Sequence, residues 1–291
     1  MPRSLMAIGA SSDLGVHVDG ARLGPATILS RVKDSQLPRL LLPPAIYKKH
    51  RATHDKAKNL VGVLEYNLQL YKIIATALSS GYKPIMIGGD HSLSIASGLA
   101  SLDYHQNLGL IWLDAHTDFH TLKTTITGNL HGLPLACLCG AEKQLTTFDD
   151  CHYYDPSKVV IVGARSVDDP EWDNLCAAGV HIFTNQAIRE QGLISVLERA
   201  WNYATNDTRG LHFSFDLDVL DPQIAPGVSV PVPDGLRTKD LSVTLDFFKR
   251  HWEDIQSFDL VEYNPRLDRD HQTLTLAERI LQTIIDINAQ S

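Results

Sequence analysis

The sequence lacks the features that mark several common classes of protein. It has only four cysteines in 291 residues, Cys137, Cys139, Cys151 and Cys176. None forms the Cys-x-x-Cys spacing of a zinc or redox site, so we expect reduced thiols and no disulfide scaffold. No apolar run reaches the length that crosses a membrane, and the N-terminal apolar stretch is too short for a signal peptide. We therefore expect a cytoplasmic protein with no membrane association.

Positive charge is also scarce. The chain has 26 Lys and Arg against 34 Asp and Glu, which gives a net charge of −8. Proteins that bind nucleic acids need clustered Lys and Arg for the phosphates, so we expect a small-molecule substrate and no nucleic-acid partner. A Gly-rich phosphate loop and a Gly-x-Ser-x-Gly elbow are both missing, which disfavours nucleotide binding and serine hydrolysis.

The apolar residues predict an α/β fold. Short runs rich in β-branched and aromatic residues predict five buried strands, at residues 83–87, 108–113, 158–162, 211–215 and 257–261. Helix-like stretches lie between or after them, at residues 57–79, 92–102, 130–139, 170–178, 238–249 and 274–287. This alternation predicts a mainly parallel sheet with helices on both faces. No linker divides the chain, so we expect a single domain over residues 1–291.

Polar clusters follow four of the predicted strands. They begin with the segment Gly88-Gly-Asp-His-Ser92 and continue with Asp114-Ala-His-Thr-Asp118, Asp216-Leu-Asp218 and Glu262. In an open parallel sheet, ligands bind outside the carboxyl ends of the strands, where these clusters fall. Asp114, His116 and Asp118 share one face only if the backbone between them stays extended.

The composition of these clusters suits two neighbouring divalent cations. Carboxylates can bridge two metal ions, and imidazoles complete the ligand sets. Without cations, so many carboxylates in one cavity would repel one another and take up protons. Two divalent ions remove that conflict and generate hydroxide from a bridging water near neutral pH. The pattern therefore predicts a two-metal hydrolytic site.

The ordered motifs resemble the signatures of a known superfamily. They are Gly88–Ser92, Asp114–Asp118, Gly128-Asn-Leu-His-Gly132, Ser214-Phe-Asp-Leu-Asp-Val-Leu-Asp-Pro222 and Glu262-Tyr-Asn-Pro265. They look like those of the ureohydrolases, which include arginase, agmatinase and formimidoylglutamase, and are most like those of arginase. The resemblance implies a three-layer α/β/α fold and two manganese(II) ions per chain. It also implies hydrolysis of L-arginine to L-ornithine and urea by a metal-bridging hydroxide.

The resemblance also implies roles for individual residues. One ion would be bound by four side chains: His91, Asp114, Asp118 and Asp216. The other would be bound by a set that shares two of them: His116, Asp114, Asp216 and Asp218. Among the catalytic residues, which include Asp118, His131 would transfer a proton to the leaving amine and Glu262 would bind the guanidinium. Asp90 is expected to orient His91 or to form a turn, and Asp221 to be a turn acid.

A further set of residues is expected to bind the amino-acid end of the substrate. By resemblance, His120, Thr127 and Asn129 would contact the α-carboxylate, and Asp168, with Glu171 nearby, the α-ammonium. Two positions depart from the usual arginase pattern, since His120 replaces an Asn and Ser166 replaces an Asp. His120 could shorten the pocket or admit another guanidino acid.

Two alternatives stay open at this point. The chain could be another ureohydrolase, namely an agmatinase, a guanidino-acid hydrolase or a formimidoylglutamase, or a catalytically idle family member that acts as a binding subunit. The family suggests a homo-oligomer, either a trimer or a hexamer. The physiological substrate, the native metal and an organelle address are not decided by the sequence.

Overall fold

The protein folds around one parallel β-sheet. We use a computed structural model, which describes residues 3–33, 37–45, 56–146, 148 and 151–290. The strands of these residues are β1 (Leu5–Ala10), β2 (Arg39–Leu41), β3 (Lys83–Gly88), β4 (Gly109–Leu113), β5 (Val159–Ala164), β6 (His181–Thr184), β7 (Leu211–Asp216) and β8 (Ile255–Val261). Their order in the sheet is β2-β1-β3-β8-β7-β4-β5-β6, and every pairing is parallel.

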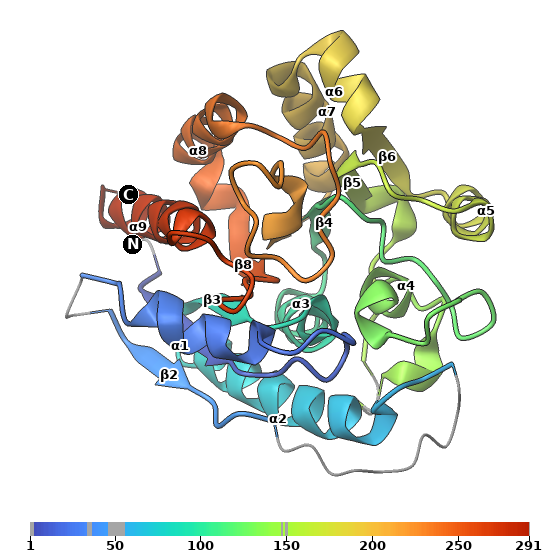
Figure 1. Cartoon of the computed structure of the whole chain (residues 1–291), viewed down its shortest axis with the longest axis horizontal. Helices are drawn as coiled ribbons and strands as arrows, with labels where there is room; N and C mark the ends of the chain where they lie inside the picture. The colour runs from blue at the N-terminus through green and yellow to red at the C-terminus, as the bar shows by residue number, and fades with distance from the viewer. Residues whose placement is uncertain (1–2, 34–36, 46–55, 147, 149–150, 291) are drawn as a thin grey trace.

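Helices cover both faces of the sheet and make a three-layer α/β/α fold. The apolar cluster on one face takes side chains from α2 (Leu60–Ser79), α3 (Ser94–His105), α4 (Pro134–Leu138) and α5 (Asp169–Ala178). The cluster on the other face takes them from α1 (Gly24–Leu29), α6 (Asn185–Gln191), α7 (Leu193–Thr205), α8 (Thr238–His251) and α9 (Gln272–Gln290). Figure 1 shows α6 to α9 along one side of the molecule, and α2 and α4 along the other.

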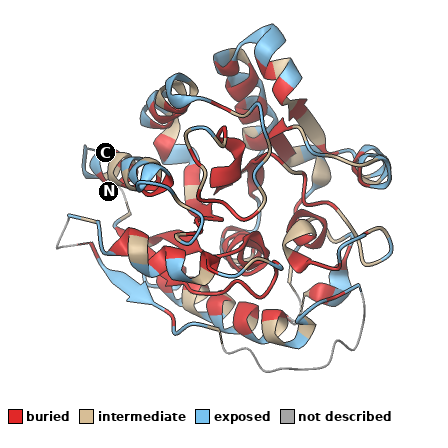
Figure 2. Ribbon diagram, viewed as in Figure 1, coloured by how far each residue is buried: buried red, intermediate tan, exposed pale blue. Residues whose placement is uncertain are grey.

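Burial explains why the central strands are rich in apolar residues. Strands β3, β4, β5 and β7 are buried along their entire length, because helices pack on both of their faces. Figure 2 shows this buried centre and the exposed outer faces of the helices. The edge strand β2 is exposed along its whole length.

The structure confirms the predicted fold class and all five predicted strands. Five of the six predicted helices also appear, with ends that shift by up to three residues. The helix predicted at residues 130–139 is wrong in part, because it consists of a 3₁₀ turn (Leu130–Gly132) followed by the short α4. Pro134 allows a new helix to begin there, since proline at the first helical position loses no hydrogen bond.

Several elements were not predicted from the sequence: β1, β2, β6, α1, α6 and α7. Helix α7 had a clear signal. Its buried residues recur at helical spacing, from Leu193 through Val196, Leu197, Ala200 and Trp201 to Ala204. Strands β2 and β6 are three and four residues long, too short for a reliable period-two pattern.

The sheet order brings the predicted functional residues together. The motifs follow β3, β4, β7 and β8, which are neighbours in the order β3-β8-β7-β4. Because the strands are parallel, all four motifs leave the sheet at the same edge. The segment after β5, which contains Asp168 and Glu171, begins beside them.

The structure also bears on the cysteines and on membrane-spanning helices. All four cysteines are free: Cys137 is buried, Cys139 and Cys151 are partly buried, and Cys176 is exposed. Within the described ranges, no helix has both the length and the apolar character needed to span a membrane. The single domain over residues 1–291 stays a prediction.

Candidate active site

A buried histidine, His91, faces three carboxylates. Its Nδ1 atom lies 3.1 Å from Asp114 Oδ2, 3.2 Å from Asp118 Oδ2 and 3.0 Å from Asp216 Oδ2. The other ring nitrogen, Nε2, lies 2.8 Å from Ser214 Oγ, which fixes the orientation of the ring. His91 Nδ1 is buried and makes no hydrogen bond of ordinary geometry, so three oxygens and one nitrogen converge on the same space.

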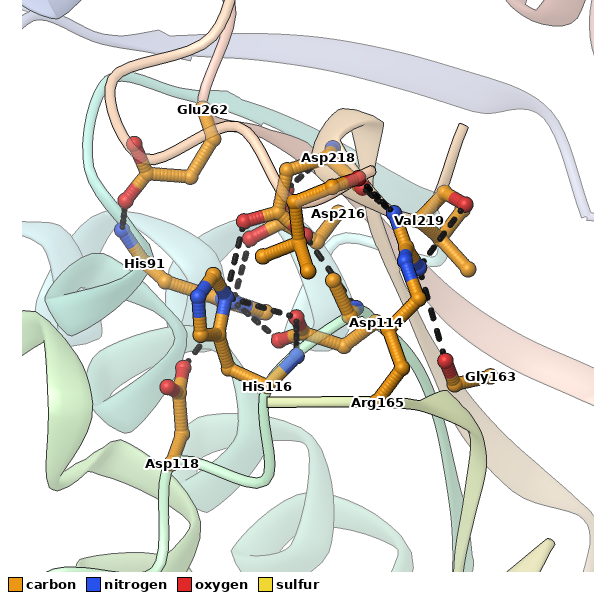
Figure 3. Close-up of polar contacts among 12 residues, drawn as sticks. His91, Asp114, His116, Asp118, Gly163, Arg165, Asp216, Asp218, Val219 and Glu262 are labelled. Carbon is orange, nitrogen blue, oxygen red and sulfur yellow. Dashed lines mark hydrogen bonds and ion pairs between the residues drawn. The ribbon is translucent and has the colours of Figure 1, made fainter. Parts of the chain in front are cut away.

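A second histidine makes a similar group beside the first. His116 Nδ1 lies 2.9 Å from Asp218 Oδ2 and 3.5 Å from Asp114 Oδ1. Asp114 therefore turns one oxygen toward each histidine, as a bridging carboxylate would (Figure 3). Asp216 Oδ1 accepts a hydrogen bond from the backbone N–H of Asp218 at 2.7 Å, which fixes the Asp216 carboxylate against the turn that carries Asp218.

Local backbone geometry aims these side chains. The backbone at Asp118 and Glu262 lies in the left-handed region, with φ of 51° and 68°. Non-glycine residues adopt the left-handed conformation only at a cost in free energy, and residues strained in this way cluster at functional sites. At Gly89 no side chain fits, because a Cβ there would lie 1.8 Å from Ser12 O. Only glycine allows the loop before His91 to pack so closely.

Burial and mutual repulsion perturb the carboxylates. Burial, with the nearby charge of Asp114, raises the pKa of Asp118 to about 7. Burial and the neighbouring carboxylates also raise the pKa of Asp216 far above its usual range. The pKa of Asp114 moves the other way, because its two histidine partners outweigh the effect of burial. Without a cation the cluster is thus forced to hold protons, which indicates that it is built for positive charge.

Trp112 supports the first histidine and the bridging carboxylate at once. Its ring stacks on His91, with centroids 3.9 Å apart and planes 5° apart. Its Nε1 donates a hydrogen bond to Asp114 Oδ2 at 2.8 Å. In the sequence, Trp112 is simply part of a predicted strand. Its position two residues before Asp114, with the same side-chain direction, is the signal that points to this role.

Replacing Trp112 with Phe is expected to weaken metal binding about 10- to 100-fold, since such supporting contacts to ligands have effects of that size. An aromatic ring remains to stack on His91, while the hydrogen bond to Asp114 and part of the indole packing are lost. Titration with Mn²⁺, followed by bound metal per chain, measures the change. An unchanged affinity would show that Asp114 is oriented without Trp112.

Glu262 and His131 form a pair on the neighbouring loops. Glu262 Oε1 accepts hydrogen bonds from the backbone of His91 at 2.9 Å and from His131 Nδ1 at 3.1 Å. Its other oxygen, Oε2, is buried and has no partner among the described residues. Burial opposes protonation of His131, but the hydrogen bond to Glu262 and nearby carboxylates raise its pKa above the ordinary value.

A cavity of about 450 Å³ opens over this site. Its lining includes the predicted metal ligand His116 and all the predicted catalytic and substrate residues except Glu262: Asp118, His120, Thr127, Asn129, His131, Asp168 and Glu171. It also contains His17, Arg165 and Ser166. His120, Asp168 and Glu171 form a third group whose ligand atoms lie close enough to hold a metal ion.

Two further residues have roles that the sequence did not assign. Arg165 donates hydrogen bonds to backbone carbonyls of the neighbouring loop, including that of Asp218 at 2.8 Å (Figure 3). This contact holds the loop that carries Asp216 and Asp218. His17 Nδ1 lies 2.8 Å from Asn129 Nδ2 at the cavity wall. His17 belongs to no recognisable motif, whereas Arg165 lies in the segment that carries Asp168 and Glu171, which is the signal that could have drawn attention to it.

The two acids kept off the ligand sets act in loops. Asp90 accepts hydrogen bonds from the backbone of Ser92 and of Gly15, both at 2.9 Å, and therefore forms a turn without a direct hydrogen bond to His91. Asp221 accepts from the backbone of Gln223 and Gly235. Both match the turn role that the sequence suggested.

Comparison with known proteins agrees with this geometry. The model of the Arginase family matches residues 3–286. The chain belongs to the arginase family. It is 31% identical over 293 residues to an arginase of Bacillus subtilis, with 98% of both chains covered. These relatives identify it as a hydrolase of that family.

Solved structures show the same relationship. The arginase of Bacillus caldovelox superposes with a TM-score of 0.88 at 30% identity, over 97% of this chain and 98% of that one. An arginase of Entamoeba histolytica, solved in complex with L-ornithine, gives a TM-score of 0.86 at 25% identity, over 98% and 99% of the two chains. The arginase family fold thus extends over nearly the whole chain.

Proposed function

We propose that the protein hydrolyses the guanidinium group of L-arginine to give L-ornithine and urea. The observation that carries this proposal is Glu262 Oε2, a buried and unpaired carboxylate oxygen beside the two His and Asp groups. A guanidinium N–H can donate a charge-assisted hydrogen bond to this free oxygen, which would give the buried acceptor a cationic partner. The curated arginase relatives support the same substrate class.

The ligand set fits two divalent ions, which we propose to be manganese(II). It contains two imidazoles, four carboxylates and no thiolate, a combination that suits hard or borderline cations. One ion would be held by four side chains: His91, Asp114, Asp118 and Asp216. The second would be held by His116, Asp114, Asp216 and Asp218. When bound, the ions supply a water molecule activated as a nucleophile near neutral pH.

Glu262 and His131 would act on opposite ends of the bond that breaks. Glu262 Oε2 accepts an N–H of the guanidinium and holds its carbon in place. A carboxylate oxygen can only accept, so His131 donates from Nδ1 to Glu262 and keeps Nε2 for proton transfer. As water adds to the guanidinium carbon and the bond to the side-chain nitrogen breaks, His131 delivers a proton to the leaving amine.

The amino-acid end of the substrate would lie against the cavity wall. Thr127 and Asn129 line that wall and are proposed to contact the α-carboxylate. Asp168 and Glu171 lie across from His120 and are proposed to recognise the α-ammonium. This arrangement favours arginine over agmatine, which lacks the carboxylate.

A urea-release assay on manganese-loaded protein tests the proposal. Arginine, agmatine, 4-guanidinobutyrate and formimidoylglutamate are compared side by side. We expect arginine to exceed agmatine by about 100-fold or more in kcat/KM, because two unpaired polar groups cost about 1–3 kcal/mol each. A higher kcat/KM with agmatine or formimidoylglutamate than with arginine would contradict the proposal that arginine is the preferred substrate. Two bound manganese ions without any hydrolysis would indicate an idle family member.

Three broader features belong to the same proposal. We propose that residues 1–291 act as one ureohydrolase domain, since all strands that carry the site belong to one sheet. A cytoplasmic location and a trimeric or hexameric homo-oligomer are proposed as well. Cell fractionation and sedimentation velocity test these two features.

A further inference from the structure

At the cavity wall, His120 already engages the two acids proposed to recognise the α-ammonium of the substrate. Its Nε2 lies 3.3 Å from Asp168 Oδ2 and 3.8 Å from Glu171 Oε2. Its Nδ1 lies 3.2 Å from Thr124 Oγ1. One ring thus connects the acids after β5 to the loop after β4.

The remaining oxygens of both acids are used by the backbone. Asp168 Oδ1 accepts from Glu171 N at 3.1 Å and caps helix α5. Glu171 Oε1 accepts from Phe119 N at 2.9 Å. The oxygens that face the cavity are therefore the two that already face His120.

This contact needs no charge on the imidazole. A neutral ring with its proton on Nε2 turns that donor toward Asp168 Oδ2, 3.3 Å away, and accepts the hydroxyl proton of Thr124 at Nδ1. The buried Glu171 faces the same nitrogen at 3.8 Å, beyond hydrogen-bond distance. The ring therefore places its donor beside both acids, where an α-ammonium would otherwise lie.

The carboxylate end of the cavity is independent of these acids. Asn129 Oδ1 accepts from Lys58 Nζ at 3.3 Å, and Asn129 Nδ2 meets His17 Nδ1. The lysine cation lies behind Asn129, and Asn129 and His17 line the cavity, so positive charge and polar groups are near the place proposed for the carboxylate. Recognition of the carboxylate does not depend on the state of Asp168 or Glu171.

We infer that His120 stands in for the α-ammonium of the substrate. The protein then hydrolyses guanidino carboxylates that lack an α-amino group, as well as arginine. The matched compound is 5-guanidinopentanoate, which differs from arginine only by that amino group. This inference rests on the proposed function, since it assigns substrate recognition at the same site.

The test compares kcat/KM for arginine and for 5-guanidinopentanoate in the manganese-loaded protein and in His120→Asn. For the wild type we expect the two values to agree within about tenfold. In His120→Asn we expect the preference for arginine to rise at least tenfold, because the freed acids gain a charge-assisted hydrogen bond worth about 1.5–3 kcal/mol. The change should appear mainly in KM. Lys123→Ala, an exposed change in the same loop, should leave the ratio unaltered.

The outcomes separate this inference from the proposed function. If the wild type hydrolyses arginine but discriminates against 5-guanidinopentanoate by more than about tenfold, the inference is wrong and the proposed function stands. An equal loss for both substrates in His120→Asn would mean that His120 only holds the loop, which also overturns it. So would a third tightly bound metal ion per chain that His120→Asn removes. If neither guanidino carboxylate is hydrolysed, both proposals fail.

Discussion

Asp114→Asn should lose at least one of two bound manganese ions and lower urea release by roughly 10²–10⁴-fold. Asp114 turns one oxygen toward His91 and the other toward His116, at 3.1 Å and 3.5 Å. Asparagine offers one neutral acceptor in place of two charged ones. Removing one partner from a buried charged pair costs about 3–5 kcal/mol, and 1.4 kcal/mol corresponds to tenfold.

Metal content per chain and kcat are measured on the same preparation of Asp114→Asn. Asp246→Asn is the matched control, because this exposed carboxylate pairs only with surface Lys249 and should change neither quantity. The variant should stay folded, since it keeps the size of the side chain and can accept the hydrogen bond of Trp112. Two tightly held ions together with most of the rate would show that Asp114 does not bridge.

The predicted metal ligands could be placed from sequence because fold and motif constrain each other. Short buried strands give the sheet, and a parallel sheet puts every strand-end motif at one edge. The structure brings Asp118 and Asp216 to His91, and Asp218 to His116. The two ligand sets themselves stay predictions. The order of the strands was not predictable, because β8 pairs between β3 and β7 through contacts that no local pattern encodes.

A second buried histidine, His212, has a structural role, and its place in the chain distinguishes it from His91. His212 lies 3.1 Å from Asp259 and 2.7 Å from Ser257, so its polar atoms are satisfied within the sheet. It sits inside β7, whereas His91 follows the end of β3. No functional motif surrounds His212 in the sequence, and its partners in the structure give it a structural role.

The wall of the cavity was the least predictable part of the site. His17, Lys58 and Arg165 come from three loops that only the tertiary structure brings near residues 118–131. The contact of His120 with Asp168 and Glu171 also joins two loops, after β4 and after β5. Side-chain partners across loops depend on packing rather than on sequence period, so a departure such as His120 can be noticed in the sequence but not interpreted.

The second large effect is expected for His131→Ala. We expect kcat to fall by about 10²–10⁴-fold, the usual size of a lost acid–base contribution, while two manganese ions stay bound. His131 Nδ1 is engaged by Glu262, and the residue lines the cavity. Rapid-mix kinetics on manganese-loaded protein, with metal analysis of the same sample, checks both parts.

Comparison with Glu262→Gln separates proton transfer from substrate binding. Glutamine keeps the shape of Glu262 but loses the charge that pairs with a guanidinium, so KM for arginine should rise in that variant. In His131→Ala, Glu262 keeps the hydrogen bond from His91 N and its free oxygen, so KM should change little. Imidazole added to the buffer should restore part of the lost turnover only in His131→Ala. An unchanged kcat in that variant would assign His131 to the structure of the loop, and the proton for the leaving amine would then need another donor.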